Sequence, residues 1–171
     1  MIKILTEYER LNLLNQYKIL RDLAEIKKDE DSVKYYDELA TIVSEGYVLD
    51  YGQLTEELND EFPETECSFV WDTLSMNRAI HDSYNKIRNP QISKEEIRFD
   101  GFDGNEEFRY YNLCNHIILT LKHFSEQTED GRRDFNSHFR RCAKYREMLN
   151  KWQSMGKPYN LSESDIQYLI S

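Results

Sequence analysis

Apolar residues recur every three or four positions along most of this 171-residue chain, the spacing that places them on one face of an α-helix. Proline and glycine are rare, at three and six residues, so few positions interrupt such helices. We therefore expect an all-α protein with little or no β structure. The length suits one multihelical domain over residues 1–171, with the option that an N-terminal helical part, 1–62, packs on a C-terminal one, 63–171.

Three helices are expected in the N-terminal part. The first follows a capping box formed by Thr6 and the glutamate three residues later, and it runs to about Lys27. Ser32 is expected to cap the second helix, which Gly46 ends. A short third helix is expected over Gln53–Phe62. The first helix is expected to pack through Leu11, Leu14, Tyr17 and Leu20.

The C-terminal part shows three further helical patterns. Pro63 is suited to open a long helix, which Asn89 and Pro90 close. The segment Asp103–Glu106 has capping-box spacing before a second apolar stripe, and a third stripe covers about Ser137–Ser154. The second stripe consists of Tyr110, Cys114, Ile117, Leu121 and Phe124.

The segment GFDGN, residues 101–105, invites comparison with loops that bind metals or phosphate. The EF-hand spacing fails around both of its glycines, and no lysine follows as a Walker phosphate loop requires. Capping of a helix explains most of the motif. The alternative is a small polar or anionic ligand at the amides of that helix N-terminus, held by Gly101, Asp103, Gly104 and Asn105.

No recognised catalytic motif occurs in the chain. His116 and His123 lie two helical turns apart, too far to share a metal unaided, and neither H-E-x-x-H nor G-x-S-x-G is present. Cys142 follows two arginines, which could favour a thiolate, but it also continues an apolar stripe. We expect no catalytic residue, no metal site and no cofactor.

Charge is segregated along a chain whose net charge is −10. Asp50–Glu66 holds seven acids and no lysine or arginine, whereas Arg132–Lys157 holds eight bases and two acids. Arg140, Lys144 and Lys151 are expected along one exposed flank of a helix. That flank could pair with the acidic segment of the same or a twin chain, or contact a protein partner, a small anion or RNA. The acidity of the chain disfavours DNA binding.

Hydropathy and cysteine content indicate where in the cell the protein is expected. No apolar run approaches the roughly 18 residues of a membrane span, and the first residues lack a signal-peptide pattern. Three scattered cysteines do not suggest a disulfide framework. We expect a cytoplasmic protein without a membrane association.

Several segments together resemble one family. LNQYKIL, SEGYVL, FDGFDGNEEFRYYN, FNSH, YREMLNKW and the ending LSESDIQYLI are similar in order and spacing to the bacterial YfbU-like family. The resemblance covers nearly the whole chain, and GFDGN and YxxMLxxW are its most specific parts. It implies a cytoplasmic, multihelical bacterial protein with no established biochemical activity.

Two functions remain open. The first is a non-enzymatic interaction or regulatory protein, a homodimer held by aromatic-rich helical faces, since the chain has 12 tyrosines, eight phenylalanines and two tryptophans. The alternative is a ligand-binding protein or enzyme with its site at Gly101–Asn105.

Overall fold

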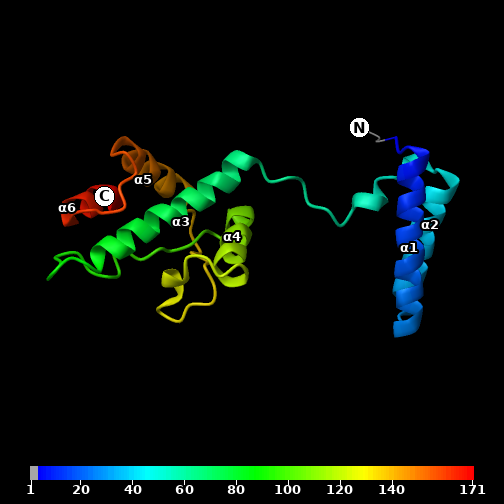
Figure 1. Ribbon diagram of the computed structural model, residues 1–171, viewed down its shortest axis with the longest axis horizontal. Helices are drawn as coiled ribbons and strands as arrows, with labels where there is room; N and C mark the ends of the chain where they lie inside the picture. The colour runs from blue at the N-terminus through cyan, green and yellow to red at the C-terminus, as the bar shows by residue number, and fades with distance from the viewer. Residues whose placement is uncertain (1–3) are drawn as a thin grey trace. The chain divides into compact units, whose positions relative to one another are not determined.

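Helices dominate the computed structural model, which describes residues 4–171 and contains no β-strand within them. The all-α expectation is confirmed. The chain divides into two compact units, residues 1–61 and residues 62–171, and each is described by itself (Figure 1).

The N-terminal unit is a helical hairpin of α1 (Glu7–Lys27) and α2 (Glu30–Glu45), which lie side by side (Figure 1). The predicted capping box is present, because the Thr6 hydroxyl accepts a hydrogen bond from the backbone N–H of Glu9 at 3.2 Å and the Glu9 carboxylate accepts one from the Thr6 N–H at 2.8 Å. Both helices end in a left-handed residue, Lys28 after α1 and Gly46 after α2.

Two expectations for this unit are wrong. Asp29, not Ser32, caps α2, since its carboxylate accepts hydrogen bonds from both the backbone N–H and the hydroxyl of Ser32. The helix expected over Gln53–Phe62 is only a 3₁₀ turn, η2 (Gln53–Thr55), which follows another, η1 (Val48–Asp50). Leu58, which would extend an apolar face there, is exposed, so little burial supports a longer helix.

The core of the hairpin forms between one face of α1 and one face of α2. Tyr17 is buried and Leu14 partly buried, as expected, but Leu11 and Leu20 are exposed. Leu13 and Ala24 take their places toward α2. The buried residues of this core are Tyr17, Leu39, Ile42, Val43 and Tyr51.

The C-terminal unit is organised around α3 (Glu64–Tyr84), which contacts α4, α5 and α6. Figure 1 shows α5 and α6 beside α3. The chain order after α3 is α4 (Phe108–Asn115), the π-helical turn η3 (His116–Thr120), the 3₁₀ turn η4 (Ser125–Thr128), α5 (Cys142–Ser154) and α6 (Glu163–Ile170).

Three helix boundaries in this unit differ from expectation. Helix α3 ends at Tyr84, before Asn89, and the helix expected after Asp103–Glu106 begins only at Phe108. The helix expected from Ser137 begins at Cys142, because His138 has φ 57°, a left-handed backbone that an α-helix cannot contain. Leu121, expected in the core, is exposed.

Candidate functional site

The GFDGN segment pairs with the FNSH segment, residues 135–138, in the middle of the C-terminal unit. The N–H of Phe102 donates to the carbonyl of Phe135 at 3.0 Å, and the N–H of Ser137 donates to the carbonyl of Phe102 at 3.0 Å. Gly101 has φ +92°, and a Cβ there would lie 1.9 Å from the carbonyl oxygen of Phe135. Only glycine permits this close approach of the two backbones.

The polar groups of GFDGN that were expected to hold a ligand have partners within the chain. An Asp103 carboxylate oxygen accepts hydrogen bonds from the N–H groups of Asn105 (2.9 Å) and Glu106 (3.4 Å). The N–H of Gly104 donates to the side-chain oxygen of Asn136 at 3.1 Å. A ligand at this loop would therefore have to displace the Asp103 carboxylate or the Asn136 amide.

Glu107, a residue that the sequence did not single out, joins this loop to the start of α5. Its carboxylate accepts hydrogen bonds from the N–H groups of Arg141 (2.9 Å), Cys142 (2.8 Å) and Asp103 (3.2 Å). Burial alone would raise the pKa of Glu107, but the three amides together outweigh it and lower that pKa. We call these four residues the Glu107 clamp.

The Glu107 clamp affects the protonation of Cys142, whose thiol follows two arginines in the sequence. Burial, and then the adjacent Glu107 carboxylate, raise the pKa of Cys142 to about 12. Its thiol therefore stays protonated at neutral pH. Cys142 is partly buried and packs against the core of the C-terminal unit.

Two of the three basic residues expected on one flank, Lys144 and Lys151, lie on α5, and the third, Arg140, does not. Arg140 lies before α5 and pairs with Glu106, while Lys144 is exposed on α5. Lys151 pairs with Glu147 at 3.3 Å and lies over the ring of Tyr168. Only Arg140 departs from the expected flank, because α5 begins at Cys142, while Lys144 and Lys151 lie seven residues apart on one side of that helix.

Among the described residues of the C-terminal unit, one ion pair joins the acidic stretch Asp50–Glu66 to the basic stretch Arg132–Lys157. The guanidinium of Arg146 lies 2.6 Å from the carboxylate of Glu66, which also accepts a hydrogen bond from the Tyr110 hydroxyl at 2.7 Å. That hydroxyl bond, together with Arg146, lowers the pKa of Glu66 despite partial burial. The pair fixes the first turn of α3 to α4 and α5.

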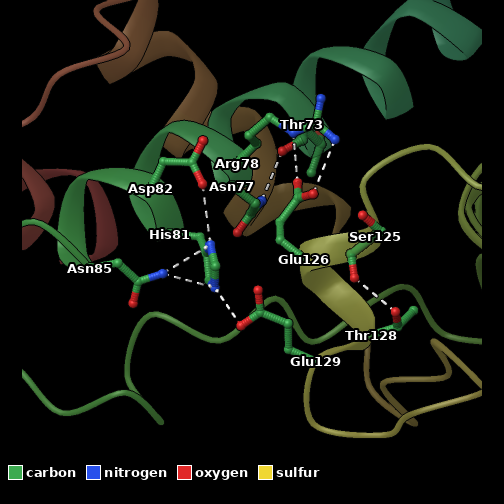
Figure 2. A network of polar contacts seen from close by, with 10 residues as sticks. All are labelled: Thr73, Asn77, Arg78, His81, Asp82, Asn85, Ser125, Glu126, Thr128 and Glu129. Atoms are coloured by element: carbon green, nitrogen blue, oxygen red, sulfur yellow. Dashed lines mark hydrogen bonds and ion pairs between the residues drawn. The ribbon is translucent and has the colours of Figure 1, made fainter.

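A polar network connects the second half of α3 to the η4 turn (Figure 2). Arg78 donates two hydrogen bonds, of 2.7 and 3.0 Å, to the two carboxylate oxygens of Glu126. His81 lies between Asp82, at 3.4 Å from its Nδ1, and Glu129, at 3.4 Å from its Nε2. Asn85 also contacts the His81 ring (Figure 2). The network holds η4 against α3.

A pocket of about 180 Å³ lies next to this network. Gln127 lines it and is 7% exposed, and the nitrogen of its side-chain amide is buried without a hydrogen-bond partner among the described residues. Lys94 and Arg98 also line the pocket, and their side chains have no ion-pair partner within residues 4–171. The rest of the lining is His81, Glu95, Ile97, Phe99, Glu126, Glu129, Asp130 and Arg132.

Sequence reasoning missed this pocket because its residues come from three separate segments, around 81, 94–99 and 126–132. The only signal in the sequence was the presence of His81 within the apolar spacing of the helix that Pro63 opens. Its side chain is 14% exposed, in agreement with a boundary position.

None of the helices between residues 4 and 171 has the length and hydropathy to cross a membrane. Over the same residues, no three histidine, cysteine or acidic side chains gather as metal ligands would.

Comparison with known proteins agrees with the motifs. The sequence model of the YfbU domain matches residues 3–171. The UPF0304 protein MJECS11 of Methanocaldococcus jannaschii is 36% identical over 175 residues, which cover 98% of this chain and 99% of that protein. This relative is archaeal, so the similarity extends beyond the bacteria that the resemblance implied. The chain belongs to the YfbU family.

Proposed function

We propose that this chain is a cytoplasmic, non-enzymatic interaction protein, a regulator or adaptor that works as a homodimer. One observation supports this function above others. The hairpin leaves large apolar side chains exposed along the face of α1 opposite its core, and we call them the outer stripe. They are Tyr8, Leu11, Ile19, Leu23 and Ile26, between 47% and 78% exposed.

The polar groups that most resembled a catalytic site support the same proposal. The carboxylates of Asp103 and Glu107 accept hydrogen bonds from backbone amides, and the raised pKa of Cys142 keeps its thiol protonated. Ten of the 22 aromatic residues belong to the core of the C-terminal unit or pack against it, and the outer stripe replaces the aromatic-rich faces as the proposed contact.

Sedimentation velocity of the whole chain tests the dimer. We expect the species of 20.6 kDa to be replaced by one of twice that mass as the concentration rises from about 1 µM to about 200 µM. A single 20.6 kDa species over that whole range would contradict the proposal.

A second candidate function is the binding of a small carboxylate-bearing molecule in the pocket beside His81. The unpartnered donor of Gln127 supports it, because a buried amide without a partner costs about 1–3 kcal/mol, which an acceptor in the pocket would offset. Lys94 and Arg98 supply positive charge for a carboxylate in a lining that also holds Arg132 and four acidic residues. The volume suits a molecule of amino-acid size.

Thermal-shift measurements with single amino acids and small dicarboxylates test this second function. We expect one of these compounds to raise the melting temperature of the wild type, and Gln127→Leu to abolish that rise. Gln153→Leu, at an exposed position on α5 outside the pocket, serves as the control and should keep it. No shift with any compound, or an equal shift in Gln127→Leu, would refute the pocket as a ligand site.

A further inference from the structure

Four of the five residues of the outer stripe are arranged symmetrically about the middle of α1. Relative to Tyr17, Tyr8 and Ile26 lie nine residues to either side, and Leu11 and Leu23 lie six residues to either side. Tyr8 and Ile26 are therefore eighteen residues apart, which is five whole turns, so they point in the same direction from the helix axis.

This symmetry matches an antiparallel pair of identical helices centred on the level of Tyr17. In such a pair, Tyr8 of one copy lies level with Ile26 of the other, and Leu11 lies level with Leu23. The apolar levels of Tyr8 and Leu11 then meet apolar levels of the twin, while Ile19 lies level with Asn15 of the twin. Tyr17 itself faces the opposite way, into the hairpin core, and does not take part.

Charge decides between an antiparallel and a parallel pair, since a parallel pair would also match apolar levels. The first turn of α1 carries Glu7 and Glu9 against Arg10, and its C-terminal end carries Lys27 and Lys28 against Glu25, so the two ends have opposite net charge. A parallel pair would bring ends of like net charge together. An antiparallel pair places each negative end beside the positive end of its twin, with Glu7 level with Lys27 and Glu9 level with Glu25. The helix dipoles are also opposed in the antiparallel pair.

We infer that the outer stripe is a docking surface for a second copy of this chain, in which two α1 helices pair antiparallel and each α1 lies between its own α2 and the α1 of its twin. The inference rests on the proposed dimer and adds its surface and its orientation. The two can fail separately, because a dimer formed through another surface would leave the proposed function intact.

A charge placed at the centre of the stripe tests the surface. Ile19 is 59% exposed and makes no part of the hairpin core, so Ile19→Lys should leave helicity unchanged while it weakens dimerisation at least tenfold. Thr41→Lys adds the same charge at an exposed position of α2 and should dimerise as the wild type does. Sedimentation velocity and circular dichroism measure both effects. A dimer of Ile19→Lys as stable as the wild type would overturn the inferred surface.

Disulfide trapping tests the orientation. We expect a mixture of Tyr8→Cys and Ile26→Cys chains to give a covalent dimer under mild oxidation, above the background of the wild type with its three native cysteines. Each variant alone should give little product. Crosslinking of either variant with itself, and not with the other, would show a parallel pair and overturn the antiparallel arrangement.

Discussion

Replacement of Glu107 by glutamine tests whether the clamp holds the C-terminal unit together. The wild-type carboxylate accepts hydrogen bonds from three backbone amides, and Glu107 is 8% exposed. Hydrogen bonds to a charged group contribute about 1.5–3 kcal/mol each, although they do not add fully. Glutamine keeps one acceptor oxygen but presents an NH₂ group to at least one amide donor. We therefore expect Glu107→Gln to lower the free energy of unfolding by about 2–4 kcal/mol at pH 7.

The two tryptophans make this measurement specific to one unit. Trp71 and Trp152 both lie in residues 62–171, so tryptophan fluorescence during urea unfolding reports on the C-terminal unit. Glu106→Gln is the matched control, since the Glu106 side chain is 55% exposed and pairs with Arg140 at the surface. The control should change the free energy of unfolding by less than about 1 kcal/mol.

The pH dependence gives the clamp a second readout. The folded state lowers the pKa of Glu107, so its contribution to stability is complete above the unfolded pKa of about 4.3 and is lost as the pH falls through the lower, folded pKa. The stability difference between wild type and Glu107→Gln should therefore shrink below about pH 4.3. A variant within about 0.5 kcal/mol of the wild type, with an unchanged pH profile, would refute the clamp.

Three further predictions concern the same unit. Gly101→Ala should prevent stable folding of the C-terminal unit, because its Cβ would overlap the carbonyl oxygen of Phe135; native tryptophan fluorescence would contradict this. Cys142 should resist alkylation by iodoacetamide at pH 8, since its pKa is raised to about 12, and mass spectrometry of tryptic peptides would detect a modified thiol. Asn136→Ala should cost about 1–3 kcal/mol in urea unfolding, because its side-chain oxygen accepts hydrogen bonds from two backbone amides, and an unchanged midpoint would refute this role.

Local rules predicted the parts of the fold that depend on neighbouring residues. The capping box at Thr6 and the left-handed end at Gly46 are both present, because each involves groups within four residues of one another. Asp103 likewise accepts hydrogen bonds from amides two and three residues ahead, although the helix starts later than that spacing suggested.

The parts that sequence reasoning missed depend on residues far apart in the chain. Glu107 caps α5 across 34 residues, and this contact, not the local pattern after Ser137, accompanies the start of that helix at Cys142. The pocket beside His81 brings Lys94 and Gln127 together in the same way. Apolar spacing does not predict such pairings, because it shows which residues share one face of a helix but not which residues pack against that face.

The same limit explains why Leu11 of α1 was wrongly expected in the core of the hairpin. Leu11 was expected in the core because it continues an apolar spacing, yet the core takes Leu13, Tyr17 and Ala24 from the other side of the helix. A helix with apolar residues on two faces is ordinarily covered on both. Helix α2 covers one face of α1, and Ile19 remains 59% exposed at the centre of the other. The apolar content of α1 thus exceeds what the hairpin uses, which is the pattern expected of a helix that packs against a second partner.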